Sequence, residues 1–470
     1  MISLRKWQGE CVDLVLKHYQ QSQKHFLCLA TPGAGKSIMA AEVAAQLLIQ
    51  DKIDFIFCFS PSTAISQGLA QTFKTRLNRA FDGSIGALGA SYTYQSLQFF
   101  DNSFWSLLTS HRVFVVFDEI HHCAGLNIAD ANAWGEEIIK HIQSQAKYTL
   151  SLTGTPWRSD NLPISLSTYN HTNSKIKCHY TYGLKQAVKD KVCRTPNIVL
   201  IDNGKIISKS SESEVHHFSS IREYLDGPFG AYQNIITDKA CMRYLLNSGI
   251  NKLETIQAKK VNAAGLVVAS SIDHAIQLHS IISNEFKKEA VIVTHKHDNS
   301  SDIINNFRNS TTDWIISVGM ISEGTDIPRL QVCCHLSKVK TELYFRQVLG
   351  RVLRVNEGIN QEAWLYTFAE PNLIKYAYRV AEEIPEKEVI LKNSMPYHNQ
   401  VIATQENKLF FNKLQPLESL DMGAWGTSKA MKKSSKTTRS AHQCITFDEH
   451  YFDIVGDFRQ QVIDVLRFQG

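Results

Sequence analysis

The chain lacks the cysteine patterns that predict a zinc site or a disulfide framework. Its ten cysteines are scattered along 470 residues, and no two of them stand as Cys-x-x-Cys. Apolar runs long enough to span a bilayer are also missing, and residues 1–7 turn polar too early for a signal peptide. We therefore expect a cytoplasmic protein that does not contact a membrane and that keeps its thiols reduced.

Neither sign of charge dominates the composition. The formal net charge is +5 and the isoelectric point is near 8.5, which is compatible with a polyanionic partner without establishing one. Hydrophobic residues make up 43% and charged residues 20%, as in ordinary globular proteins with sizeable cores. The length predicts two to four domains.

An octet at residues 30–37 predicts a phosphate-binding loop. It reads Ala-Thr-Pro-Gly-Ala-Gly-Lys-Ser, and it follows the apolar run 26–29 and precedes an apolar, helix-like segment. The two glycines let main-chain N–H groups turn toward an anion, and the next helix adds its positive N-terminal end. The predicted ATP-binding residues of this loop are Thr31, Gly33, Ala34, Gly35, Lys36 and Ser37. Lys36 would reach the β- and γ-phosphates, and the Ser37 hydroxyl would hold Mg²⁺.

A second acidic motif supports this interpretation. The general pattern begins with glycine, whereas this octet begins with Ala30, so an ordinary strand-to-helix turn is the alternative for the octet alone. Residues 113–117 form a β-branched and aromatic run typical of a buried parallel strand, and Asp118 and Glu119 follow it directly. Asp118 would share the Mg²⁺ ion with Ser37, and Glu119 would polarise an attacking water.

The order of apolar runs predicts two α/β units. In the first half, strands alternate with helices and each polar motif stands at the carboxyl end of a strand, as in a doubly wound parallel sheet. A similar unit follows, with strands at 265–269, 290–294 and 314–318. Beyond it, Arg351 and Arg354 are three residues apart, which would place both on one helix face toward the phosphates. For these two arginines in isolation, the alternative is a basic surface helix.

In this order, the motifs resemble those of the superfamily 2 DExH-box helicases and translocases, in the branch of the XPB-like proteins and restriction-enzyme motor subunits. The resemblance covers residues 4–370 and rests on segments 4–8, 30–37, 60–67, 94–97, 118–121, 153–155, 324–328 and 347–354. It implies two tandem RecA-like lobes that bind ATP and Mg²⁺ between them and grip nucleic acid. By the same resemblance, Gln8 reads the adenine, Gly324 and Asp326 belong to the nucleotide site, and Gln347, Arg351 and Arg354 join Glu119 in catalysis.

The predicted organisation has four parts. They are the ATP-binding lobe (1–170), a partly helical inter-lobe segment (171–262), the second lobe (263–386) and an extension of unknown role (387–470). Apolar residues at helix-compatible spacing over 447–466 predict a small helical element, so the expected fold is two doubly wound α/β lobes with a mostly helical C-terminal extension. The adjacent His216 and His217 are expected to be plain surface residues, because no metal-ligand spacing supports them.

Two functions follow from these predictions. The first is an ATP-dependent helicase or translocase that moves on the nucleic-acid backbone. DNA is favoured over RNA because residues 118–122 and 153–158 resemble the branch of the family that acts on DNA. The alternative is an ATP-gated clamp or sensor that recruits an effector without unwinding. We find no nuclease constellation, so a nuclease or other effector would come from a partner protein, for example in a repair, restriction or defence assembly.

Overall fold

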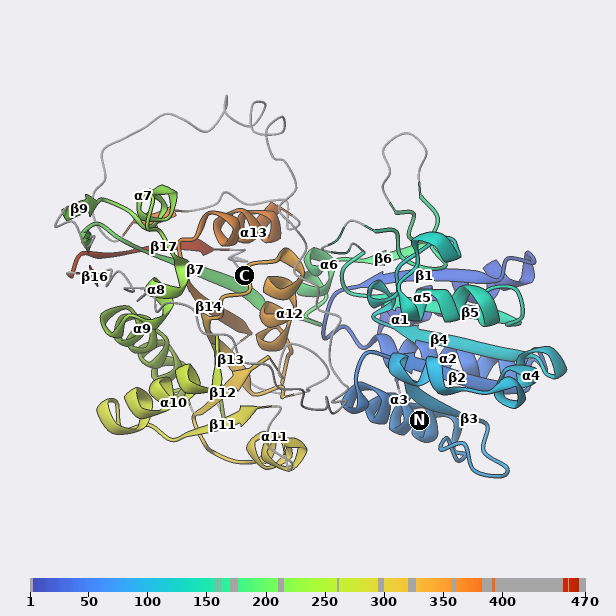
Figure 1. Ribbon diagram of the computed structural model, residues 1–470. Helices are drawn as coiled ribbons and strands as arrows, with labels where there is room; N and C mark the ends of the chain where they lie inside the picture. The colour runs from blue at the N-terminus through green and yellow to red at the C-terminus, as the bar shows by residue number, and fades with distance from the viewer. Residues whose placement is uncertain are drawn as a thin grey trace, which may run out of the picture.

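The computed structural model describes residues 3–156, 158, 160, 162–169, 176–209, 215–259, 262–294, 300–319, 327–356, 361–382, 391–393, 451–454 and 456–464. These residues form two α/β lobes that lie side by side (Figure 1). This arrangement confirms the predicted pair of doubly wound parallel-sheet lobes. Within the described ranges, every helix is too short or too polar to cross a membrane.

The first lobe is built on a six-stranded sheet in the order β3-β2-β4-β5-β1-β6, in which every pairing is parallel. Its strands are β1 (His25–Ala30), β2 (Phe55–Ser60), β3 (Gly89–Thr93), β4 (Val113–Asp118), β5 (Tyr148–Thr153) and β6 (Tyr180–Tyr182). Its α-helices are α1 (Lys6–Gln20), α2 (Lys36–Ile49), α3 (Thr63–Leu77), α4 (Asn102–Ser110), α5 (Ala133–Glu137) and α6 (Leu184–Lys189).

Both faces of the first sheet are buried, which explains its continuous apolar strands. On β4, Phe114 and Val116 join one hydrophobic cluster, whereas Val115 and Phe117 join a second cluster on the other face. Successive side chains of a strand point to opposite faces, so a strand covered on both sides needs apolar residues at every position. The burial of all of β4 up to Asp118 leaves the first carboxylate at the edge where the strand ends.

The second lobe has an eight-stranded sheet in the order β11-β12-β10-β13-β14-β7-β17-β15. Its strands are β7 (Thr195–Asn203), β10 (Ala264–Ala269), β11 (Ala290–Thr294), β12 (Trp314–Val318), β13 (Leu330–Leu336), β14 (Glu362–Phe368), β15 (Leu391–Asn393) and β17 (Phe458–Asp464), and a small sheet holds β8 (Ile206–Lys209), β9 (Val215–Phe218) and β16 (Tyr451–Ile454). Its helices are α7 (Ile221–Asp226), α8 (Tyr232–Thr237), α9 (Lys239–Gln257), α10 (Ile272–Ser280), α11 (Ser300–Asn309), α12 (Glu342–Val352) and α13 (Pro371–Glu382).

The helical prediction for 447–466 is wrong. The described part of this segment forms β16 and β17, and β17 pairs antiparallel with β7 over seven residue pairs. Gly456 has φ +64 and separates the two strands. The apolar spacing that suggests a helix gives way to pairing along β7, which buries Ile463 completely. The same helix prediction led us to expect a mostly helical extension, so that part of the fold expectation is also corrected.

The segment 171–262 is divided between the lobes. β6 extends the first sheet beside β1, whereas β7 pairs with β14 in the second sheet and α9 packs against β10, β13 and β14. The chain therefore passes from one lobe to the other between α6 and β7, at residues 190–194. Within this crossover, Cys193 contacts the phosphate-binding loop.

Candidate nucleotide-binding site between the lobes

The phosphate-binding loop joins β1 to α2, as the sequence predicts. Gly33 and Gly35 have φ +82 and +92, in the left-handed region that favours glycine. An added Cβ atom at position 35 would lie 2.8 Å from Nε2 of Gln8, so the end of that side chain would have to move. α2 begins at Lys36, so its N-terminal N–H groups and Ser37 stand at the loop.

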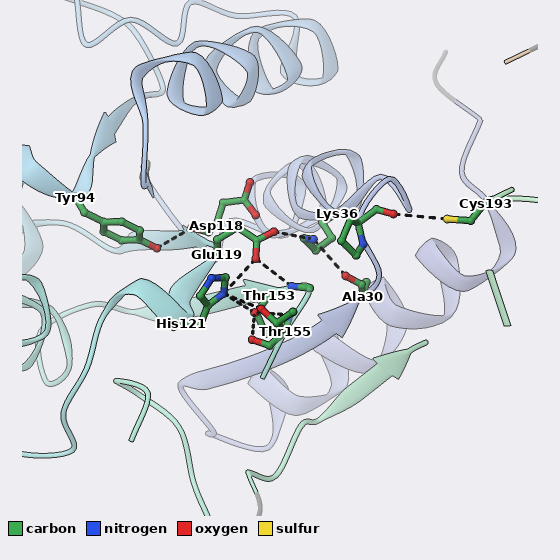
Figure 2. Close-up of polar contacts among 11 residues, drawn as sticks. Ala30, Lys36, Tyr94, Asp118, Glu119, His121, Thr153, Thr155 and Cys193 are labelled. Atoms are coloured by element: carbon green, nitrogen blue, oxygen red, sulfur yellow. Dashed lines mark hydrogen bonds and ion pairs between the residues drawn. The ribbon is translucent and has the colours of Figure 1, made fainter. Parts of the chain in front are cut away.

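Lys36 is buried and forms an ion pair with Glu119. Its Nζ atom lies 3.1 Å from Oε1 of Glu119 and donates to the carbonyl oxygen of Ala30 at 3.2 Å (Figure 2). Burial alone would lower the pKa of Lys36, but the carboxylates of Glu119 and Asp118 outweigh it and raise the pKa. The lysine is therefore a fixed positive charge inside the loop.

Glu119 is held in an unusual backbone conformation. Its φ and ψ are 52° and 53°, in the left-handed region that a side chain enters at a cost of about 1 kcal/mol. This turn points the carboxylate back toward the loop, where Oε2 accepts the N–H of Gly154 at 3.0 Å and lies 3.3 Å from Nδ1 of His121 (Figure 2). Burial would raise the pKa of Glu119, but Lys36, His121 and Gly154 together hold it well below its usual range.

The residues predicted to hold Mg²⁺ lie on neighbouring elements. Ser37 is on the first turn of α2, and Asp118 is the last residue of β4, where it is mostly buried. The main-chain carbonyl of Asp118 accepts the hydroxyl of Tyr94 at 2.8 Å, which fixes the end of the strand. A hydroxyl and a carboxylate next to a buried lysine are the donor set that a phosphate-bound Mg²⁺ ion uses. The chain therefore fits this cofactor.

Gln8 contacts the loop through its side-chain amide. Its Nε2 donates to the carbonyl of Gly35 at 2.9 Å, and its Oε1 accepts the main-chain N–H of Arg5 at 2.8 Å. Arg5 itself donates to the carbonyl of Ala34 at 2.7 Å. Arg5 lies in the 4–8 segment that carries the family resemblance, but sequence reasoning gave it no role of its own.

The second lobe reaches the loop through the end of α12. A Cβ atom on Gly350 would lie 2.7 Å from Cβ of Pro32, and one on Gly33 would lie 3.1 Å from Cγ of Arg354. Cys193 adds a contact from its Sγ to the carbonyl of Pro32 at 3.6 Å (Figure 2). The structure thus places Arg354 against the loop that carries Lys36.

The prediction that Arg351 and Arg354 share a helix face is wrong. α12 ends at Val352, so Arg351 is on the helix, whereas Arg354 forms an isolated antiparallel bridge with Cys193. Pairing with the chain that enters the second lobe replaces another helical turn. Gln347 and Arg351 lie on α12 and are half-buried. Gly324 and Asp326 lie outside the described residues, so their predicted roles stay predictions.

Two protein-family models match the chain on either side of this contact. The type III restriction enzyme res subunit matches residues 1–158, and the helicase conserved C-terminal domain matches residues 248–356. Both matches agree with the resemblance to superfamily 2 helicases. The first match contains the loop and Glu119, and the second contains α12 and Arg354.

Known proteins similar to this chain include an uncharacterized protein of Mycobacterium leprae, 27% identical over 392 residues. That alignment covers 80% of this chain and 63% of the relative, so the chain spans less than two thirds of the relative's length. The DNA 3'-5' translocase XPB2 of Sulfurisphaera tokodaii is 23% identical, with 75% of this chain and 79% of that protein covered.

Among solved structures, the ATP-dependent Type ISP restriction-modification enzyme LlaBIII bound to DNA is similar with a TM-score of 0.53. The match is 14% identical and covers 82% of this chain and 30% of that one. At this identity, the likeness concerns the fold, and it agrees with the two α/β lobes described above.

Proposed function

We propose that the chain is an ATP-dependent nucleic-acid translocase or helicase that acts on DNA. The observation that carries the proposal is the position of Arg354. This cation of the second lobe lies beside the phosphate-binding loop of the first lobe, whose Lys36 forms an ion pair with Glu119. A nucleotide site made from both lobes is complete only when the lobes are together. Binding and hydrolysis can therefore change how the lobes sit on a strand.

Each residue has a defined task in this proposal. Lys36 leaves Glu119 for the phosphates, which frees the carboxylate to orient and polarise a water. Arg354, with Arg351, stabilises the negative charge that spreads over the transferred phosphoryl group. Mg²⁺ held by Ser37 and Asp118 would neutralise charge on the phosphate oxygens.

The glutamate is also joined to the segment that follows β5. Glu119 accepts the Gly154 N–H, and His121 Nδ1 lies 2.9 Å from Oγ1 of Thr153. Movement of residues 153–155 would therefore shift the Glu119 carboxylate that polarises the water. This connection supports coupling between the binding of a nucleic-acid strand and ATP hydrolysis, as the family resemblance of residues 153–155 implies.

DNA is favoured as the track. The S. tokodaii relative is a DNA translocase by name, and the mild positive charge of this chain suits contact with phosphates without sequence preference. A protein partner that carries a nuclease or other effector remains part of the proposal, as does a cytoplasmic location.

The test is ATP turnover measured without nucleic acid and then with single-stranded DNA, duplex DNA, single-stranded RNA and duplex RNA. We expect a strong rise with DNA. A rise with RNA alone would overturn the choice of track, and absence of turnover under every condition would overturn the enzyme assignment. A flat, nonzero rate would favour the alternative, an ATP-gated clamp or sensor that needs a protein partner. Strand displacement measured with the stimulating nucleic acid separates unwinding from movement without unwinding.

A further inference from the structure

Arg194 is a fully buried arginine on the stretch of chain that enters the second lobe. Its side chain has no exposed surface. Among the described residues, its guanidinium donates to three main-chain carbonyls: those of Leu330 at 2.7 Å and Val352 at 3.2 Å from Nη1, and that of Pro328 at 2.9 Å from Nη2. Burial lowers the pKa of Arg194 to about 10, so the group still carries its charge at neutral pH.

A buried charge at this position is not explained by a gain in the stability of the fold. Removing a guanidinium from water is costly, and an apolar side chain of similar volume often packs in a core at least as well. What an arginine adds is geometry, because its planar fork fixes the directions of several donors at once. The position of Arg194 therefore points to a role in placing the segments that it contacts.

Those segments are the start of β13 and the end of α12. Pro328 precedes β13, Leu330 is its first residue, and Val352 is the last residue of α12. The main chain of Arg194 acts at the same place, since its N–H donates to the carbonyl of Leu353 at 2.7 Å. The side chain and main chain together hold both residues that precede Arg354.

The neighbouring residue extends this connection to the first lobe. Cys193 bridges Arg354 by main-chain pairing, and its Sγ contacts the carbonyl of Pro32 in the phosphate-binding loop. Residues 193–194 thus lie between the loop and the end of α12.

We propose that Arg194 is a positioning residue for ATP hydrolysis, which acts by holding the end of α12 so that Arg354 stays against the phosphate-binding loop. The inference rests on the proposed function, because it assumes that Arg354 serves catalysis. It adds a residue outside the motifs on which the resemblance rests.

The chain offers a matched control in the same lobe. Arg329 is also buried, and it donates to the carbonyls of Ser310 at 3.2 Å and Thr312 at 3.0 Å. Its guanidinium also lies 4.5 Å from the ring of Phe307. Ser310 and Thr312 precede β12, so Arg329 has the same kind of environment without contacting α12.

The experiment compares R194K with R329K in the full chain. Lysine keeps the charge and most of the length, but a single ammonium cannot reproduce the fork to three carbonyls. We expect R194K to lower kcat for ATP about 10-fold or more, while KM and nucleotide Kd change less than about 3-fold. R329K should keep kcat within about 2-fold of the wild type, even where denaturant titration shows an equal loss of stability. Equal losses of kcat in the two variants, or an R194K chain that fails to fold while R329K folds, would show a purely structural role.

Two further measurements separate this inference from the proposed function. If Arg194 acts through Arg354, adding R194K to R354A should cause no further loss of turnover, whereas independent roles would give additive losses. Hydrogen exchange at residues 350–356 should rise in R194K and stay unchanged in R329K. This measurement does not depend on catalysis. Wild-type turnover that is absent, or unaffected by R354A, contradicts the proposed function. Unchanged exchange at 350–356 in R194K contradicts the positioning role by itself.

Discussion

Lys36 and Glu119 contact each other inside the first lobe, with 3.1 Å between Nζ and Oε1. The same two side chains are assigned to the phosphates and to the attacking water. A lysine that binds phosphate cannot keep its full contact with the carboxylate, so nucleotide binding and release of Glu119 are linked events. The pair also keeps the carboxylate ionised, since Lys36 helps to hold the pKa of Glu119 well below its usual range.

The first prediction concerns E119Q. The amide keeps the size of the side chain but cannot polarise water as a base, so turnover should fall by about 100-fold or more. Nucleotide affinity should be equal or higher, because Lys36 no longer has an anionic partner to leave. Single-turnover hydrolysis and fluorescent-nucleotide titration measure the two effects. E136Q, which changes a surface pair with Lys140, is the control. Normal hydrolysis by E119Q would refute the role of Glu119.

The second prediction concerns R354A. Its contact with the phosphates is made mainly as charge develops, so kcat should fall on the order of 1,000-fold, the effect typical of an arginine supplied to such a site. KM should change only a few-fold. The control is R243A, which removes an exposed arginine of α9 paired with Glu285. A large rise in KM with an unchanged kcat would instead assign Arg354 to ground-state binding.

The third prediction tests the contact between the lobes. An added methyl group at Gly350 would lie 2.7 Å from Cβ of Pro32, whose ring cannot turn away. We expect G350A to shift α12 from the loop and to lower kcat about 10-fold, although alanine favours the helix itself by about 0.5–1 kcal/mol. G68A on α3 makes the same change where nothing lies within 4 Å. Equal activity of G350A and G68A would show that close contact between the lobes is not required for hydrolysis.

The fourth prediction concerns pH and His335, a fully buried residue of β13. Burial lowers its pKa from 6.5 to about 4, so the unfolded chain binds more protons than the folded one between these values. Its contribution to stability is complete above pH 6.5 and is lost as pH falls toward 4. Between pH 7 and pH 5, H335N should lose about 2 kcal/mol less of its free energy of unfolding than the wild type does. Urea titration at both pH values measures this difference. An identical pH dependence would contradict the assignment of a neutral buried imidazole.

The parts of the site that follow one another along the chain were predictable from sequence. The loop glycines, Lys36 and the Asp118–Glu119 pair have local signatures, because their chemistry needs fixed residue types at fixed spacing next to a strand. Arg194 has no such signature, since its partners stand more than 130 positions away in the chain and are main-chain carbonyls, which no residue type reveals. Packing between distant segments also explains the two errors of local structure. α12 ends before Arg354, which instead pairs with Cys193. Residues 458–464, whose spacing suggested a helix, instead form β17 because they pair with β7.

The place of β17 has a consequence for how this protein is made. β17 lies between β7 and β15 in the second sheet, although residues 458–464 are synthesised long after residues 195–203. The first lobe can form as it leaves the ribosome, because its sheet is complete by Tyr182. Until β17 has been synthesised, one edge of β7 in the second lobe has no partner strand, and this edge can pair with other chains. The nucleotide site needs both lobes, so it can form only after the second lobe has folded.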